Sequence, residues 1–189
     1  MITNHTQLLN ALVEKYNLNK YLEIGVQNKA NNYNKIICEN KTGIDPAVND
    51  SEIRGMTSDN YFAAVGDVKF DLIFIDGLHH ADQVKRDFEN SLRCLSDNGF
   101  IVIHDVLPEN EAGTIVPRET KQWWGDVYKF AMKMNEYEVI YKTFNIDNGC
   151  MVIKKYPRPG VVFVDEIITW DEYLKSGLKR MNVTSSIEI

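Results

Sequence analysis

The stretch DLIFIDGLHHAD, residues 71–82, constrains the fold of this chain more than any other part of its sequence. Residues 72–75 form an apolar run whose length and composition are typical of a strand buried on both faces. The run ends in Asp76-Gly77 and a pair of histidines, and residues 81–95 then repeat apolar side chains at helical spacing. A buried strand that leads through a polar turn into a helix is the repeating unit of a parallel sheet with crossover helices.

The same alternation of strand and helix extends along most of the chain. Strand patterns cover residues 21–26, 42–46, 52–56, 70–75, 99–104, 137–144 and 149–155, with the turn Asp147-Asn148-Gly149 between the last two. Helical patterns cover residues 5–16, with a cap expected near Thr6, and residues 30–39, 58–65, 81–95, 121–134 and 170–179. We therefore expect an α/β protein with a Rossmann-like, doubly wound, mostly parallel seven-stranded sheet and a C-terminal antiparallel hairpin.

The length of 189 residues suits one domain with a full hydrophobic core. No internal repeat and no linker interrupts the pattern, so a single domain is expected over residues 1–189. Residues 1–19 are expected to hold an N-terminal helix. Residues 156–189 are expected to form a C-terminal extension that includes a short apolar run at 161–164. Earlier in the chain, residues 106–120 are expected to form a long polar loop.

The charge balance limits the classes of partner. A net charge of -6 provides no basic field for binding nucleic acid or an anionic membrane, so neither is expected as a partner. Three isolated cysteines without a CxxC motif indicate a reducing compartment and no zinc site. No apolar run approaches the roughly 18 residues of a membrane span, and no signal peptide is visible, so a cytoplasmic protein is expected.

Polar side chains close or follow each of the first five predicted strands. Because the carboxyl ends of parallel strands lie at one edge of a sheet, we expect these side chains to line a common site there. A glycine after the first strand lets a ligand approach the backbone, and an acid that ends the second strand suits the two hydroxyls of a ribose. The candidate site residues are Glu23, Gly25, Asp45, Ser58, Asp59, Asp76, His79, His104 and Asp105.

Each candidate also has a purely structural interpretation. Glycine is common at strand ends, an acid before proline can cap a turn, and Asp-Gly is a frequent turn dipeptide. The sequence leaves open whether His79 is a site residue or a structural residue, whereas His80 is expected at the surface. Asp82 and Asp87 are expected as solvated or capping acids of a helix, and Trp123 and Trp124 as packing or lid residues.

Several segments resemble, in order, the class I S-adenosylmethionine-dependent methyltransferases. The closest resemblance is to a small single-domain group with an Ile-Asp-Gly-x-His signature, and it spans nearly the whole chain. The matching segments are LEIGV at residues 22–26, KTGIDP at 41–46, TSDNYF at 57–62, FDLIFIDGLHH at 70–80, GFIVIHD at 99–105, WGDVY at 124–128 and WDEYL at 170–174.

The resemblance implies a role for each matching position. In metal-dependent O-methyltransferases of similar fold, an acid that ends the fourth strand and two ligands that end the fifth bind Mg²⁺, and here these are Asp76, His104 and Asp105. His79 then falls where a general base would stand. Around S-adenosylmethionine, the resemblance places Glu23 and Gly25 at the methionine end, Asp45 at the ribose, Ser58 and Asp59 beside the adenine, and Asp76 next to the methyl donor.

The expected function is methyl transfer from S-adenosylmethionine to an oxygen, with a small-molecule or sugar hydroxyl as acceptor. His79 and Asp76 are the expected catalytic residues, because imidazole titrates near neutrality and a carboxylate can orient it or join a metal such as Mg²⁺. The oligomeric state is open, and a homodimer is one alternative.

Two other functions stay open from the sequence. The first loop after Gly25 holds no further glycine, so a catalytically degenerate binding module with the methyltransferase fold is one alternative. A metal-dependent hydrolase that uses His79, His80, His104 and Asp105 is the other. A nicotinamide enzyme is disfavoured because no G-x-G-x-x-G follows the first strand.

Overall fold

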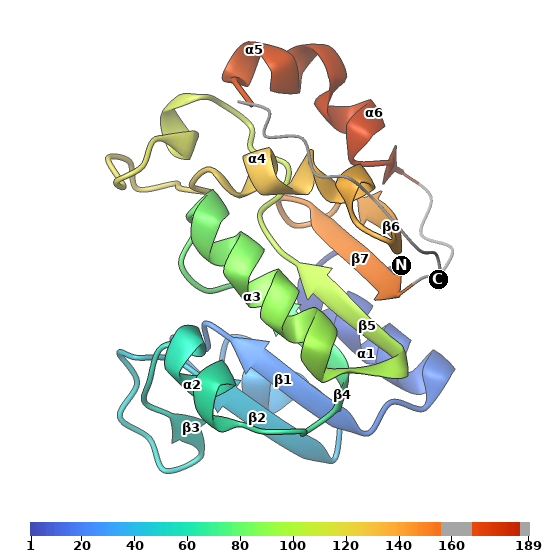
Figure 1. Ribbon diagram of the computed structural model, residues 1–189. Helices are drawn as coiled ribbons and strands as arrows, with labels where there is room; N and C mark the ends of the chain where they lie inside the picture. The colour runs from blue at the N-terminus through green and yellow to red at the C-terminus, as the bar shows by residue number, and fades with distance from the viewer. Residues whose placement is uncertain (156–167, 186–189) are drawn as a thin grey trace.

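One eight-stranded sheet runs through the computed structural model, which describes residues 1–155 and 168–185 (Figure 1). The strand order across the sheet is β3-β2-β1-β4-β5-β7-β6-β8. The strands are β1 (Lys20–Ile24), β2 (Asn40–Ile44), β3 (Ile53–Arg54), β4 (Phe70–Ile75), β5 (Leu95–Ile103), β6 (Val139–Phe144), β7 (Cys150–Lys155) and β8 (Val183–Thr184).

The pairing confirms the expected α/β, Rossmann-like sheet with an antiparallel C-terminal hairpin. Strands β1 to β5 are parallel, and β7 pairs antiparallel with both β5 and β6. The chain runs outward from β1 to β3 on one side and resumes at β4 on the other, so the strand order reverses between β1 and β4. The sheet has one strand more than expected, because the two-residue β8 adds parallel to β6 at the edge.

Helices cover both faces of the sheet. Figure 1 shows α3 in front of the sheet and α1 behind it. The helices are α1 (His5–Tyr16), α2 (Ser58–Ala64), α3 (Ala81–Cys94), α4 (Val127–Ala131), α5 (Trp170–Glu172) and α6 (Leu178–Arg180). Short 3-10 turns form at η1 (Tyr33–Lys35), η2 (Ala112–Thr114) and η3 (Met134–Glu136), and a π-helical turn, η4 (Tyr173–Gly177), joins α5 to α6.

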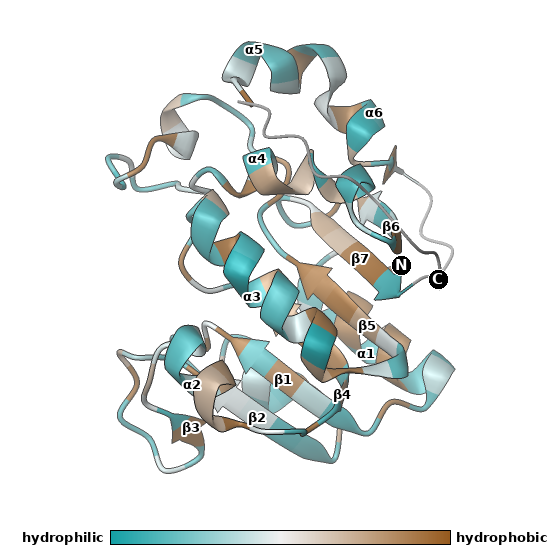
Figure 2. Cartoon of the chain, in the orientation of Figure 1, coloured by the Kyte–Doolittle hydropathy of each residue, from teal (hydrophilic) through white to brown (hydrophobic). Residues whose placement is uncertain are grey.

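Two hydrophobic cores lie on opposite faces of the sheet, and β4 contributes to both. Successive side chains of a strand point to opposite faces. Accordingly, Ile73 packs in the core that includes Phe88 of α3, and Leu72 and Phe74 pack in the core that includes Leu8 of α1. Figure 2 shows the hydrophobic residues concentrated on the strands, while the outward side of α3 is hydrophilic. This two-sided burial explains why residues 72–75 are apolar without alternation.

Three expected element boundaries are wrong or too long. The cap of α1 is Asn4, whose side chain accepts a hydrogen bond from the backbone N–H of Gln7 at 3.0 Å, and Thr6 lies inside the helix. The expected helix at 30–39 is only the turn η1. There the side chain of Asn10 bonds the backbone at Lys35 (2.9 Å) and Ile37 (3.1 Å), so polar side chains replace the helical ladder.

The expected helix at 121–134 is shortened to α4. Gly125 has a positive φ of 61°, and the N–H of Trp124 bonds back to the carbonyl of Gly113 at 2.9 Å, so the chain turns at this point instead of forming a helix. The expected C-terminal helix is confirmed as α5, η4 and α6. The expected apolar run at 161–164 lies outside the described residues.

Two expectations from composition can be compared with the structure. The three cysteines are free and buried. Among the residues that the structure describes, no helix is long and apolar enough to cross a membrane.

Candidate active site

The carboxyl ends of the parallel strands line a cavity of about 670 Å³ at the edge where polar residues were expected. Small-molecule sites commonly have volumes of about 300–1,000 Å³. The cavity lies beside the point where the strand order reverses, between β1 and β4, which is where open α/β sheets bind ligands. All the candidate residues line it: Glu23, Gly25, Asp45, Ser58, Asp59, Asp76, His79, His104 and Asp105.

Gly25 allows the ends of β1 and β4 to approach each other closely. Its φ is +91°, and a Cβ built on it would lie 2.2 Å from the carbonyl oxygen of Asp76. The N–H of Asp76 donates to the carbonyl of Ile24 at 2.9 Å, so the two strand ends are held together. Any other residue at this position would be strained and would collide with backbone. The structural requirement for glycine also keeps this part of the cavity open.

Glu23 lies buried next to Gly25. Its Oε2 accepts hydrogen bonds from the hydroxyl of Tyr21 at 2.6 Å and from Nδ2 of Asn32 at 2.8 Å. Burial raises the pKa of Glu23, and the two hydrogen bonds offset only part of that effect, so the pKa is raised to about 7. The cavity therefore contains a carboxyl group that keeps its proton to a higher pH than an exposed glutamate does.

Asp45 connects the first loop to the end of β2. Its Oδ2 accepts from the backbone N–H of Gln27 at 2.8 Å, and its Oδ1 accepts from the N–H of Ala47 at 2.8 Å. Gln27 has a positive φ of 50°, so the loop makes its turn without a second glycine. A carboxylate has about four acceptor positions. Residues in the described part of the chain use two of them, and the others are open to ligand hydroxyls.

A buried polar group lies where α2 meets α3. Ser58 is buried, and both its Oγ (3.2 Å) and Oδ1 of Asp87 (3.0 Å) accept from Nε2 of Gln83. The expectation that Asp87 is solvated is wrong, because it is 1% exposed, lines the cavity, and has a pKa raised by burial. Asp87 lies three residues after Val84, on the apolar face of α3, and this spacing could have predicted that its side chain is buried.

Four imidazole and carboxylate groups converge at the ends of β4 and β5. Nε2 of His79 lies 3.4 Å from Oδ1 of Asp76 and 3.4 Å from Oδ2 of Asp105. Nδ1 of His104 lies 3.2 Å from the same oxygen of Asp76. Within the described part of the chain, Nδ1 of His79 and Oδ1 of Asp105 are buried without a hydrogen-bond partner. Oδ1 of Asp105 also lies 3.6 Å from Nδ1 of His104, so the cluster holds buried polar atoms whose hydrogen-bonding capacity is not fully used.

Mutual attraction shifts the pKa values of these groups. Burial acts to raise the pKa of Asp76, but the charge and hydrogen bond of His104 outweigh it, so this pKa lies well below its usual range. Burial acts to lower the pKa of His79, but the hydrogen bond and charge of Asp76 and the charge of Asp105 raise it above 6.5. Burial raises the pKa of Asp105. The cluster thus favours ionised Asp76 beside a more basic imidazole.

The three expected metal ligands lie close together, since Nδ1 of His104 is 3.2 Å from Oδ1 of Asp76 and 3.6 Å from Oδ1 of Asp105, and they also take part in two donor sets. Asp76 and Asp105 converge with His79, whereas His104 converges with His5 and Asp147, and the ligand atoms of each set lie within 4.8 Å of one another. Each set includes imidazole nitrogen, and Mg²⁺ strongly prefers oxygen ligands. Neither set therefore suits Mg²⁺, and His5 and Asp147 are donor residues that sequence reasoning did not place here.

Residues 113–126 cover His79 from outside. The ring of Trp123 stacks on the ring of His79, with centroids 5.2 Å apart and an interplanar angle of 20°. Nε1 of Trp123 donates to the carbonyl of Ile115 at 2.7 Å, and the N–H of Asp126 donates to the carbonyl of His79 at 3.1 Å. Trp124 is buried, whereas Trp123 lines the cavity together with Arg118, which sequence reasoning did not place here.

Comparisons with known proteins agree with this geometry. A profile of a family described as a methyltransferase domain matches residues 6–106, more than half of the chain. No curated protein matches the sequence.

Solved structures with the same fold include several O-methyltransferases. One is a Staphylococcus aureus protein assigned as a caffeoyl-CoA O-methyltransferase (TM-score 0.57, 21% identity, covering 82% of this chain and 85% of that one). Another is the O-methyltransferase TomG of Streptomyces achromogenes, solved with SAM (TM-score 0.59, 14% identity, covering 80% of this chain and 79% of that one). A third is the O-methyltransferase of Bacillus cereus, solved with SAH (TM-score 0.58, 14% identity, covering 79% of this chain and 80% of that one).

The chain has the Rossmann-like fold of these solved structures. The chain belongs to the family of methyltransferase domains whose profile it matches. The prediction of a methyltransferase enzyme is thereby confirmed. Membership of the narrower group with the Ile-Asp-Gly-x-His signature stays a prediction.

Proposed function

We propose that this enzyme transfers the methyl group of S-adenosylmethionine to a hydroxyl oxygen of a small-molecule acceptor, with sugar hydroxyls among the candidates. The proposal rests mainly on one observation: the same cavity holds His79, a basic imidazole, and the strand ends where Gly25 and Asp45 lie. The O-methyltransferases of similar fold, two of them solved with SAM or SAH, support the same choice.

The cofactor would lie along the ends of β1 and β2. Asp45 keeps two acceptor positions free for the ribose hydroxyls, and the missing Cβ of Gly25 leaves space beside the strand for the methionine end. Ser58 and Asp59, at the start of α2, line the part of the cavity proposed for the adenine. Bound there, S-adenosylmethionine supplies an electrophilic methyl group on a positively charged sulfur. Glu23 lies buried at the same end.

His79 is proposed to remove the proton of the acceptor hydroxyl. We assign the Nε2–H of His79 to the carboxylates of Asp76 and Asp105, each 3.4 Å away. The lone pair on Nδ1, a buried atom without a hydrogen-bond partner in the described part of the chain, would then take the proton once the bound acceptor reaches it. The hydroxyl oxygen forms a bond to the methyl carbon as the carbon–sulfur bond breaks, and the hydroxyl proton passes to His79. The ionised Asp76 then stabilises the imidazolium.

Positioning and exclusion of water supply much of the remaining rate enhancement. A direct displacement needs the two reacting atoms in line and in contact. Trp123, held by its hydrogen bond to Ile115, covers one face of His79 and closes the cavity on that side. Loop residues 106–120 are therefore proposed to cover the acceptor during the reaction.

Substitution of His79, with its neighbour His80 as the matched control, tests the proposal. His80 also lies near Trp123, at 6.2 Å between ring centroids, but it does not line the cavity. We expect His79→Ala to lower kcat on a panel of hydroxylated acceptors by about 100-fold or more, the usual contribution of a general base. Calorimetry should show S-adenosylhomocysteine binding unchanged, and His80→Ala should keep turnover. Near wild-type turnover by His79→Ala would exclude His79 as the base.

The pH dependence of the reaction gives a second readout of the same role. A base must be neutral to accept a proton, and Asp76 and Asp105 hold the pKa of His79 above 6.5 despite its burial. We therefore expect kcat/KM to rise with pH through that raised pKa. In Asp105→Asn one attracting charge is lost, so the rising limb should move to lower pH. A limb that stays in place would show that another group controls it.

A further inference from the structure

We propose that His5, His104 and Asp147 form a binding site for a divalent transition-metal cation such as Zn²⁺ or Co²⁺. This inference does not depend on the proposed function, because none of the three residues is the proposed base and the test below needs no methyl donor. The site lies at the side of the cavity, and it would accept one cation from two imidazole nitrogens and one carboxylate oxygen.

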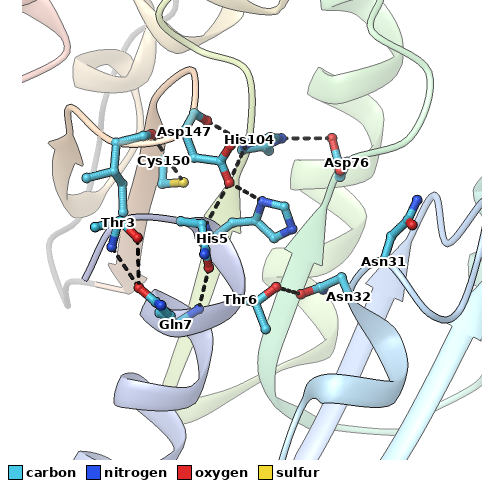
Figure 3. A network of polar contacts seen from close by, with 12 residues as sticks. Thr3, His5, Thr6, Gln7, Asn31, Asn32, Asp76, His104, Asp147 and Cys150 are labelled. Atoms are coloured by element: carbon cyan, nitrogen blue, oxygen red, sulfur yellow. Dashed lines mark hydrogen bonds and ion pairs between the residues drawn. The ribbon is translucent and has the colours of Figure 1, made fainter. Parts of the chain in front are cut away.

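Three segments that are distant in the sequence meet at this point (Figure 3). His5 is the first residue of α1, His104 follows β5, and Asp147 lies in the turn between β6 and β7. Oδ2 of Asp147 lies 2.5 Å from Nδ1 of His5 and 3.8 Å from Nε2 of His104. The carbonyl oxygen of Asp147 lies 2.6 Å from the same nitrogen of His104. The ligand atoms of the three residues lie within 4.8 Å of one another, close enough to share one cation.

The orientation of His104 matches that of a metal ligand. Its Nδ1 lies 3.2 Å from Oδ1 of Asp76, so a hydrogen bond to this carboxylate directs Nε2 towards Asp147. A ligating histidine almost always donates its other ring nitrogen to a carboxylate, carbonyl or water in this way, which fixes the ring and raises its basicity. Asp76 would therefore support the site from outside the ligand shell.

His5 and Asp147 are also held in place by their surroundings. The ring of His5 stacks on Phe74, with centroids 5.3 Å apart and an interplanar angle of 20°, and meets the ring of His104 edge-on at 4.7 Å. The backbone N–H of His5 donates to Oδ2 of Asp147 at 3.0 Å, which anchors the carboxylate to the start of α1. The half-buried donors thus need only small movements to bind a cation.

The composition of the donor set selects the kind of cation. Two imidazoles and a carboxylate are a common ligand set of zinc enzymes, with bonds of about 2.0–2.2 Å, whereas Mg²⁺ requires oxygen ligands. His5 and His104 line the cavity, so a further ligand position would face it and could hold water or an oxygen of a bound molecule. A cation also offsets the charge of three neighbouring carboxylates, Asp76, Asp105 and Asp147. The proton on Nε2 of His104 would leave to solvent as the cation binds.

Titration of the metal-stripped full chain with Co²⁺ tests the proposal, because tetrahedral cobalt has intense visible absorption bands and the measurement needs no S-adenosylmethionine. We expect one Co²⁺ per chain, displaced by Zn²⁺. His5→Asn keeps a hydrogen-bond donor near Asp147 but removes the imidazole, and it should weaken Co²⁺ binding at least tenfold. Asp147→Asn should do the same, and thermal melting of both metal-free variants would show that they fold.

The matched control is His79→Ala, which alters the neighbouring donor set of Asp76 and Asp105 and leaves His5, His104 and Asp147 intact. It should keep the cobalt spectrum and affinity. Absence of cobalt bands and of binding heat in the wild type would overturn the proposal. Loss of the bands in His79→Ala together with their retention in His5→Asn would also overturn it, because the cation would then occupy the other donor set.

Discussion

Glu23 shows at the scale of one residue how the fold changes the chemistry of a side chain. In the sequence it is an acid within a strand, and in the structure it is 2% exposed, with Tyr21 and Asn32 as its hydrogen-bond donors. Burial penalises the charged form and raises the pKa from 4.5 to about 7. Folding therefore favours the protonated carboxyl, and the stability of the protein must depend on pH around neutrality.

The sign of this dependence follows from the two pKa values. The folded protein binds the extra proton between pH 4.5 and 7, so the stabilisation is fully present below 4.5 and is lost as pH rises through 7. The amide in Glu23→Gln stays neutral and can accept both hydrogen bonds. Between pH 5 and pH 8 we expect the wild type to lose about 2 kcal/mol more unfolding free energy than the variant. Urea denaturation at both values measures this, and equal losses would contradict the raised pKa.

At the scale of elements, the segment that follows η2 holds the turn after β4 that carries His79. A Cβ on Gly125 would lie 1.8 Å from the carbonyl oxygen of His79, and φ at Gly125 is +61°. The side chain of Asp126 also accepts from the N–H of Ala81 at 2.7 Å, at the start of α3. The position of His79 therefore depends on a segment more than thirty residues further along the chain, and the truncation of the expected helix at 121–134 makes this contact possible.

Two glycine-to-alanine substitutions distinguish the effect of the close contact between Gly125 and His79 from the effect of backbone strain alone. Gly66 has a similar φ of +66°, but a Cβ there would have no atom within 4 Å. Gly66→Ala should cost only the left-handed strain, about 1 kcal/mol, without an effect on turnover. Gly125→Ala should cost clearly more, about 2 kcal/mol or above, and should lower kcat because His79 is displaced. Chemical denaturation and methylation assays measure both effects, and equal results for the two variants would contradict the role of the contact.

At the scale of the whole molecule, the sheet brings four strand ends and the start of α1 to one cavity. A ligand that binds only the folded state stabilises it by mass action, by about 2.7 kcal/mol at 100 times its dissociation constant. For a chain of this size that corresponds to a rise in Tm of roughly 5–10 °C. The glycine-poor first loop leaves the cavity open, with Val26, Gln27 and Asn31 in its lining.

Thermal melting with S-adenosylhomocysteine therefore tests whether the whole cavity works as a cofactor site. We expect a Tm rise of that size in the wild type. A smaller rise is expected in Asp45→Asn, because the substituted amide has fewer free acceptor positions for ribose hydroxyls. No rise in the wild type at saturating ligand, confirmed by the absence of binding heat, would favour the alternative of a degenerate binding module.

The sequence by itself determined the order of the first seven strands, the parallel sheet and the candidate residues at its carboxyl edge. These follow from local patterns, since an apolar run such as residues 72–75 needs burial on both faces and strand ends share one edge. Only the tertiary structure decided the burial of Asp87, the pKa of Glu23 and the division of the histidines between two donor sets. These features depend on contacts between segments that are distant in the sequence, such as those of His5, His104 and Asp147. The local spacing of apolar and polar residues does not predict such contacts.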